Sequence, residues 1–308
     1  MQRRFRIGTR GSKLALIQAH MVADHVGRVL GLAPDVACEI VTFKTQGDIE
    51  QVRNLSEIGG KGLFTFELEE ALHNGGIDLA VHSMKDMPTL LPDGLVIDCI
   101  LEREDPRDAF ISTKGASLAE LPRNAVVGTS SLRRGAQVLS KRPDVTIVPF
   151  RGNVETRLRK LADGVADATM LAMAGLVRME LQDRATAPLS PDEMLPAVAQ
   201  GAIGVERRAS DDEAARILAH FHHTESGLRV AAERALLAVL DGSCRTPIAA
   251  LAEITGKRMS LRAMILTPDG TEVIETARDG LASDAVAMGV DAGDELKSRA
   301  GPHFFTGV

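Results

Sequence analysis

The sequence predicts an α/β protein, with two doubly wound units of similar design followed by a small α+β domain. Strand-like and helix-like segments alternate in the same order in residues 5–81 and 125–171. Such alternation is typical of mostly parallel sheets. The pattern changes after about His220, where three strand-like runs lie between two helical segments. The length of 308 residues also favours several domains, because a single hydrophobic core rarely grows so large.

The first predicted strand begins at Phe5 and breaks at Gly8. Ser12 stands where a helix cap is expected, since its hydroxyl can accept a hydrogen bond from a backbone N–H of the first turn. The helix after it has a stripe of mainly apolar residues at helical spacing, made of Leu14, Ala15, Ile17, Gln18, Met21 and Val22.

The same pattern returns after Ala125, where Gly128 and Thr129 end a strand and two serines open a helix. The following strands also correspond, residues 40–43 with 146–150 and residues 78–81 with 167–171. We therefore predict a duplicated α/β unit. The ligand is expected between the two units, because open sheets bind at the carboxyl ends of their strands, next to helix N-termini.

Five arginines lie at the predicted strand ends and helix starts of these units: Arg10, Arg133, Arg134, Arg151 and Arg157. A guanidinium pairs bidentately with a carboxylate, and the amides of a helix N-terminus add to the attraction. A solvated surface position is the better expectation for any single arginine, by roughly two to one. Their common placement favours a site for a polyanion.

Pro-containing stretches at residues 87–92 and 188–196 flank the second unit and are predicted hinges. The chain between Leu195 and Glu206 is expected to cross back into the first unit. Thr224 can cap the helix that opens the last domain. Three strands (248–254, 259–266, 272–277) and a helix near 283–299 complete it. The predicted domains are residues 1–101 with 202–219, residues 102–201, and residues 220–308.

Composition excludes several classes of protein. A net charge of −6 and only nine Phe as aromatic residues disfavour a nucleic-acid surface. The longest uncharged apolar run, Ala168 to Val177, is too short to cross a membrane, and the N-terminus lacks a secretory signal. We expect a cytoplasmic monomer without a membrane partner. The three cysteines are widely spaced, which disfavours disulfides and a metal site.

Asp86 is the candidate catalytic carboxylate. It follows the strand 78–81 and can stabilise a developing cation or move a proton. The alternative is a plain surface pair with Lys85, favoured roughly two to one on spacing alone. His82 is expected to pack in the interior rather than act as a base.

Cys244 lies in a polar turn beside Arg245, a setting in which a thiol becomes reactive. Cys38 and Cys99 lie in apolar runs and are predicted to be buried. The run Gly59–Phe64 lacks the Ser or Thr that a phosphate loop needs after Gly-Lys. The preceding polar stretch, residues 46–58, fits a mobile lid and an ordinary surface loop equally well.

Together these stretches resemble the hydroxymethylbilane synthase family, from Arg6 to about Ala277. The resemblance depends on residues 59–64, 80–88, 102–110, 127–134 and 151–154, followed by Gln200-Gly201-Ala202 and Gly242-Ser243-Cys244. It implies that the first two domains are like the halves of a periplasmic binding protein. The small third domain would hold the cysteine.

The resemblance further implies a transferase that joins four porphobilinogens, each losing ammonia, on a dipyrromethane cofactor in thioether linkage to Cys244. Asp86 would stabilise the cationic pyrrole formed when ammonia leaves. The other residues expected to bind the cofactor are Ser83, Lys85, Thr129, Ser130, Ser131, Arg133, Arg134 and Gln200. Those expected to bind the substrate are Arg10, Ser12, Phe64, Arg151 and Arg157.

Three positions depart from the family pattern. Ser243 and Ala249 stand where glycine is frequent, and Glu57 stands where a basic residue is frequent. Two other classes of protein stay open. A two-lobed protein that binds small anions would need no reactive cysteine, and a cysteine-dependent acyl transferase would need a histidine partner that the sequence does not show.

Overall fold

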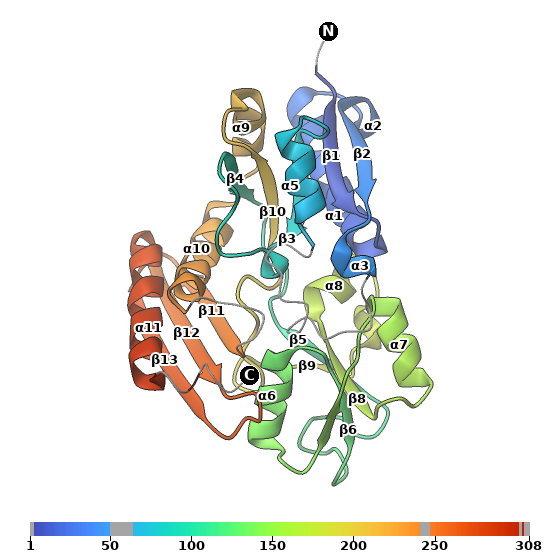
Figure 1. The fold of residues 1–308 in the computed structure, drawn as a ribbon, viewed down its shortest axis with the longest axis vertical. Coiled ribbons are helices and arrows are strands. Elements are labelled where there is room, and N and C mark those ends of the chain that lie inside the picture. Colours follow the sequence, from blue (N-terminus) through green and yellow to red (C-terminus); the bar gives the residue numbers. More distant parts are fainter. Residues whose placement is uncertain (1–2, 50–63, 241–246, 302–303, 305–308) are drawn as a thin grey trace. The chain divides into compact units, whose positions relative to one another are not determined.

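The computed structural model describes residues 3–49, 64–240, 247–301 and 304. It forms two compact units. Unit 1 contains the described parts of Met1–Arg53, Gly59–Glu104 and Ala202–Gly227, and unit 2 contains Asp105–Gly201 and the described parts of Leu228–Val308. Figure 1 shows the chain passing from unit 1 into unit 2, back again, and finally into the C-terminal part of unit 2.

Unit 1 contains a five-stranded sheet in the order β2-β1-β3-β10-β4. Its strands are β1 (Phe5–Arg10), β2 (Cys38–Phe43), β3 (Leu79–Ser83), β4 (Leu95–Ile100) and β10 (Ile203–Arg208). The first three are parallel, and β10 runs antiparallel to both β3 and β4. The predicted return of residues 195–206 to the first unit is confirmed, because β10 lies inside this sheet.

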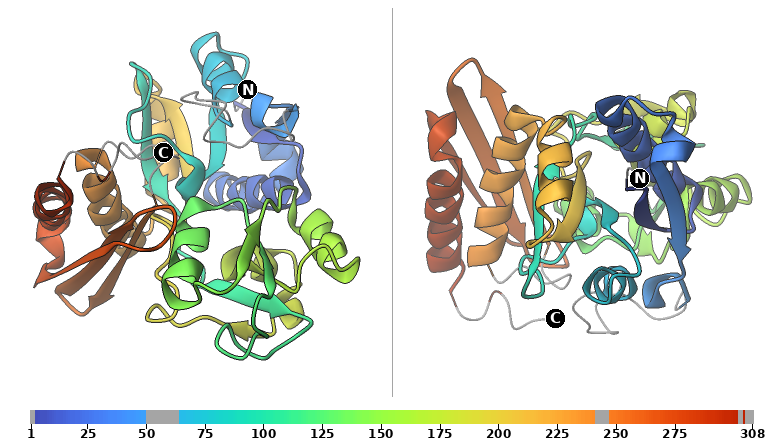
Figure 2. Two further views of the ribbon diagram at one scale, coloured as in Figure 1. Left: turned by 60° about the horizontal axis from the view of Figure 1, so that its bottom comes forward. Right: turned by 90° about the horizontal axis from the view of Figure 1, so that it is seen from above.

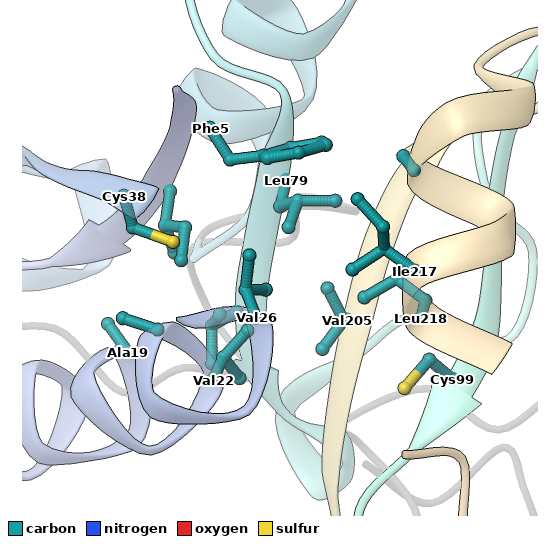
Figure 3. Packing of buried hydrophobic residues seen from close by; sticks show 14 of the residues in the cluster. Phe5, Ala19, Val22, Val26, Cys38, Leu79, Cys99, Val205, Ile217 and Leu218 are labelled. Atoms are coloured by element: carbon teal, nitrogen blue, oxygen red, sulfur yellow. The ribbon is translucent and has the colours of Figure 1, made fainter. Parts of the chain in front are cut away.

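Helices cover both faces of this sheet. On one face, α1 (Lys13–Leu30) and α9 (Asp212–Ala219) pack through residues such as Val22, Val26 and Leu218 against Phe5 and Leu79, as Figure 3 shows. On the other face, α5 (Phe66–His73) packs against Ala80 and Leu95. The shorter helices of the unit are α2 (Pro34–Ala37), α3 (Gln46–Ile49) and η1 (Met84–Asp86).

The predicted break of the first strand at Gly8 is wrong. Strand β1 continues to Arg10, and Gly8 pairs with Val41 on one side and Ala80 on the other. A Cβ atom at Gly8 would lie 2.3 Å from Cδ1 of Ile77. The glycine therefore permits close packing inside the strand and does not end it.

Unit 2 contains a second five-stranded sheet, in the order β7-β6-β8-β5-β9. Its strands are β5 (Asp108–Ser112), β6 (Val126–Gly128), β7 (Thr146–Val148), β8 (Ala168–Ala172) and β9 (Ala187–Pro188). Helix α6 (Leu132–Lys141) covers one face, and α7 (Val154–Ala162) with α8 (Met173–Arg178) covers the other. The short helix η2 (Gln182–Arg184) follows α8.

The two sheets have the same plan. In each, three parallel strands are followed by a strand antiparallel to both of its neighbours, which is β10 in unit 1 and β5 in unit 2. The predicted correspondences are confirmed, because β1, β2 and β3 occupy the positions that β6, β7 and β8 occupy in the second sheet. The fold is α/β with two doubly wound sheets.

The C-terminal part of unit 2 is an antiparallel sheet of β11 (Ile248–Thr255), β12 (Arg258–Leu266) and β13 (Val273–Leu281). Helices α10 (Thr224–Val239) and α11 (Ala285–Ala300), the latter after η3 (Ala282–Asp284), lie side by side along one face of this sheet (Figure 2). The three predicted strands and the last helix are confirmed. Strand β13 is longer than predicted because its pairing with β12 continues to Leu281.

Candidate active site

In unit 1, Arg10 and Ser83 stand at the same edge of the sheet, because they end the parallel strands β1 and β3. The guanidinium carbon of Arg10 lies 4.3 Å from the centre of the Phe64 ring, a cation–π contact that orients the arginine. Ser12 caps α1, as predicted, and its Oγ accepts a hydrogen bond from the backbone N–H of Ala15 at 3.3 Å.

Ser83 has a partner that the sequence patterns did not single out. Gln18, on the buried side of α1, lies with Nε2 3.0 Å from Oγ of Ser83. The stripe of mainly apolar residues on the first helix contained this glutamine, and a polar residue in such a stripe is a signal for a buried hydrogen bond. The interaction fixes the Ser83 hydroxyl next to the turn that carries Lys85 and Asp86.

Asp86 lies on that turn, η1, directly after β3. Met84 and Met87 on either side of it are buried, whereas Lys85 and Asp86 are exposed. The backbone N–H of Met84 donates to the carbonyl of Ala202 at 3.0 Å, which ties the turn to the strand β10. Within the described residues, the Asp86 carboxylate has no hydrogen-bond or ion-pair partner. It is therefore held in place by its neighbours while its own oxygens stay available.

His82 is buried, as predicted. Its Nε2 lies 2.9 Å from Oε2 of Glu206, which is completely buried on β10. Glu69 on α5 is buried too, and burial raises the pKa of its carboxyl. These groups lie in the interior of unit 1 and stabilise the position of β3.

In unit 2, the loop after β6 places three hydroxyl groups at the start of α6. Oγ1 of Thr129 accepts from the backbone N–H of Ser131 at 3.1 Å, and Oγ of Ser130 accepts from that of Phe150 at 2.8 Å. Ser131 caps α6. Each hydroxyl thus accepts a backbone hydrogen bond, and no described residue accepts its own hydrogen, which a ligand could use.

Arg133 and Arg134 follow in the first turn of α6, and both are buried. Nη2 of Arg133 lies 2.8 Å from Oδ2 of Asp108, and Nη2 of Arg134 lies 2.7 Å from Oδ1. Burial alone would raise the pKa of Asp108, but the two guanidinium groups outweigh it and hold that pKa below its ordinary value. Asp108 is thus the carboxylate that the structure pairs with both arginines, and their pairing with ligand carboxylates is not tested by it.

Gln200 belongs to the same buried cluster. Its Nε2 donates to Oδ1 of Asp108 at 2.9 Å and to the carbonyl of Pro106 at 2.7 Å. One polar atom of the cluster has no partner among the described residues, the buried Nε–H of Arg133. Binding of the cofactor by Gln200, Arg133 and Arg134 stays a prediction.

Arg151 and Arg157 flank the start of α7 and are partly exposed. Nε of Arg157 donates to the carbonyl of Gly152 at 2.9 Å, and Asn153 caps the helix. The helix start and the two cations together form a positive region suited to carboxylates.

The remaining candidates lie outside the described residues: Cys244, Ser243 and Glu57. Cys38 and Cys99 are buried free thiols, as predicted, and burial raises their pKa values to about 11 and about 12. Within the described ranges, no helix is both long and apolar enough to cross a membrane. Those ranges also hold no group of His, Cys, Asp and Glu side chains that could bind a metal ion.

Comparison with known proteins identifies related chains. Residues 5–216 match the family model "Porphobilinogen deaminase, dipyromethane cofactor binding domain", and residues 227–298 match "Porphobilinogen deaminase, C-terminal domain". The porphobilinogen deaminase of Paracoccus denitrificans is 60% identical over 304 residues, covering 99% of this chain and 97% of that protein. The chloroplastic one of Pisum sativum is 54% identical over 305 residues, covering 97% and 83%.

Among solved structures, a nutrient-binding protein from Burkholderia cenocepacia bound to methionine is 16% identical, with a TM-score of 0.43. The match covers 70% of this chain and 90% of that one. A periplasmic substrate-binding protein from Coxiella burnetii is 17% identical with a TM-score of 0.42, covering 71% and 92%.

Proposed function

The chain belongs to the porphobilinogen deaminase family, and on that premise we propose which of its residues bind the cofactor, which bind the substrate and which one is catalytic. Its function is the stepwise head-to-tail condensation of four porphobilinogen molecules, each losing ammonia, into the linear tetrapyrrole hydroxymethylbilane. The chain is thus a transferase of tetrapyrrole biosynthesis. Family membership does not favour the alternative of an anion-binding protein without catalysis.

The donor set of unit 2 fits a dipyrromethane cofactor, whose acetate and propionate groups are anions. Among the described residues, the buried Nε–H of Arg133 lacks a partner, and the hydroxyls of Thr129, Ser130 and Ser131 accept backbone hydrogen bonds but donate none. When bound, the cofactor supplies the free pyrrole carbon from which the product grows. We assign its thioether attachment to Cys244, and its binding also to Ser83, Lys85, Arg134 and Gln200.

The substrate carboxylates are assigned to Arg10, Ser12, Arg151 and Arg157, with Phe64 beside them. Support comes from the position of Arg10 at the end of β1, where Phe64 orients it, and from the cations at the start of α7. Guanidinium groups match carboxylates in geometry as well as in charge.

Asp86 is assigned the catalytic role. Loss of ammonia from the aminomethyl carbon of porphobilinogen leaves a cation delocalised over the pyrrole ring. A carboxylate that accepts a hydrogen bond from the ring N–H stabilises this charge. When the free α-carbon of the growing chain forms the new C–C bond to that methylene carbon, the carboxylate can take the proton that the α-carbon loses. The supporting observation is that the Asp86 carboxylate is exposed on a turn whose neighbours, Met84 and Met87, are buried.

The assignment of Cys244 is tested by intact mass. The purified protein should exceed its sequence mass by two pyrrole units, and Cys244→Ala should match its own sequence mass and be inactive while it stays folded. A Cys244→Ala protein that carried a pyrrole adduct, or kept full activity, would contradict the assignment.

We further propose the domain boundaries 1–101 with 202–219, 102–201, and 220–308, and a cytoplasmic monomer. The two separate sheets of unit 2 support its division into two domains. The buried free thiols Cys38 and Cys99 suit a reducing compartment. Limited proteolysis tests the boundaries, and light scattering tests the monomer, which a dimer mass would contradict.

A further inference from the structure

The segment 195–200 is joined to the three-stranded sheet of unit 2. The backbone N–H of Ala250, on β11, donates to the carbonyl of Pro196 at 3.1 Å. Leu195 packs in an apolar cluster with Ala249 and Leu251 of the same strand. This segment therefore lies against β11, which is an edge strand of that sheet.

The same segment is joined to the arginine cluster of the five-stranded sheet. Nη1 of Arg133 donates to the carbonyl of Leu195 at 2.7 Å, and Nε2 of Gln137 donates to it at 3.0 Å. At the other end of the segment, Gln200 donates to Asp108. The segment thus connects β11 with two residues to which we assign cofactor binding.

Hydrogen bonds to Glu233 stabilise this connection. Its side chain is completely buried on α10, and its two carboxylate oxygens accept hydrogen bonds from different elements. Oε2 accepts from the backbone N–H of Ala199 at 2.6 Å, and Oε1 accepts from that of Ala252 on β11 at 2.8 Å. Ala199 has a φ of 57°, in the left-handed region that residues with a Cβ avoid. A charged hydrogen bond to its N–H helps to hold that conformation.

The sequence position of Glu233 gives this contact a functional meaning. Helix α10 ends at Val239, strand β11 begins at Ile248, and Cys244 lies between them. The one carboxylate therefore holds together the helix before the cysteine, the strand after it, and the segment that ends in Gln200.

We propose that Glu233 is a positioning residue for the covalent cofactor. It fixes the two elements that flank Cys244 relative to Gln200 and Arg133, so that a cofactor attached at the cysteine meets its binding groups without rearrangement of the chain. This inference rests on the proposed function, because it requires attachment at Cys244.

The test compares Glu233→Gln with the wild type and with Glu253→Gln, a change at an exposed glutamate on β11, next to Ala252. Glutamine keeps the size of Glu233 but places an NH₂ group against one of the two backbone N–H groups. Apoprotein from cells that make no porphobilinogen is mixed with porphobilinogen, and intact mass follows the gain of two pyrrole units. Glu233→Gln should gain them roughly tenfold more slowly than both other proteins. A tenfold change in rate corresponds to about 1.4 kcal/mol of activation free energy.

The second readout is independent of turnover. Incorporation of the cofactor should raise the melting temperature of the wild type, because a ligand bound only by the native state stabilises that state. The rise should be clearly smaller in Glu233→Gln. Equal filling rates and equal rises in all three proteins would overturn the role of Glu233 alone, whereas a wild type that never gains pyrrole units would overturn the proposed function.

Hydrogen exchange keeps the inference testable if Glu233→Gln does not fold. In the wild type, peptides containing Ala199 and Ala252 should become more protected together when the cofactor is incorporated. A peptide from α1 serves as the control and should change little. Protection that stays constant at both sites on filling would contradict the proposal.

Discussion

The carboxylate of Asp108 accepts two hydrogen bonds from Arg134, at 2.7 Å from Nη2 and 3.2 Å from Nε, in the interior of unit 2. A guanidinium at the start of a helix, expected to await a ligand, is thus already paired with a protein carboxylate. The pair makes Arg134 part of the interior of its unit, and this changes what its replacement should do.

Asp108→Ala should be strongly destabilising. It leaves the buried charges of Arg133 and Arg134 without their partner, and breaking a buried pair from one side costs about 3–5 kcal/mol. Urea denaturation should show this loss. The control is Asp192→Ala, because Asp192 is 82% exposed and its ion pair with Arg262 lies at the surface. If both variants unfolded at nearly the same urea concentration, the buried cluster would contribute little to stability.

Asp78 should make stability depend on acidity. Burial opposes its ionisation, but hydrogen bonds from Arg6 and Arg3 prevail and lower its pKa from 3.8 to about 2. Because the folded pKa lies below the unfolded one, this stabilisation is present above about pH 4 and is lost as the pH falls toward 2. The free energy of unfolding should therefore fall less between pH 5 and pH 3 in Asp78→Asn than in the wild type. The control is Asp24→Asn, at an exposed position on α1, whose free energy of unfolding should change with pH as in the wild type. If the free energy of unfolding of Asp78→Asn fell as steeply with pH as that of the wild type, Asp78 would not be the source of the acid dependence.

Asp86→Ala should lower turnover by roughly two orders of magnitude, since a charge positioned against the developing cation is worth about 3 kcal/mol of barrier. Its melting temperature should stay close to that of the wild type, because Asp86 is exposed and has no partner within the described residues. Asp93→Ala, at an exposed position shortly after it, should keep full turnover. Near-normal activity of folded Asp86→Ala would show that Asp86 is not the catalytic carboxylate.

Two glycines in helices should respond in opposite ways to alanine. In α11, a Cβ at Gly289 would lie 2.1 Å from the carbonyl oxygen of Ala232, so that α10 and α11 must separate, at a cost of about 1–3 kcal/mol. In α6, the nearest atoms to a Cβ at Gly135 lie at 3.8 Å, and alanine should stabilise the helix by up to about 1 kcal/mol. Denaturation midpoints in urea measure both changes. Loss of stability in Gly135→Ala equal to that in Gly289→Ala would show that the close approach of α10 and α11 is not the cause.

Much of the fold follows from local patterns. Alternation of strands and helices, the cap at Ser12, and the repeated strand ends predict the two sheets because each signal depends on neighbouring residues. The return of the chain to unit 1 was also predicted, and residues 203–208 indeed form a strand of the first sheet. The break at Gly8 was wrong because the reason for that glycine, contact with Ile77, lies far away in the sequence.

The candidate site was predictable only in part. The exposed position of Asp86 agrees with its place after a strand, and the burial of His82 agrees with the expectation for that residue. The burial of Arg133 and Arg134 was not predicted, because Asp108 lies 25 and 26 residues away from them and no spacing connects the three. Arginines at a helix start give the same sequence pattern whether they face a ligand or an interior carboxylate.

The central claim is that this chain extends a covalently held primer, and an intact-mass measurement with limiting porphobilinogen tests it most directly. The account predicts a ladder of covalent masses above the cofactor-bearing protein, each step equal to one porphobilinogen minus ammonia, ending at four added units. A protein with its primer in place that gave only a non-covalent complex, lost on denaturation, would contradict it.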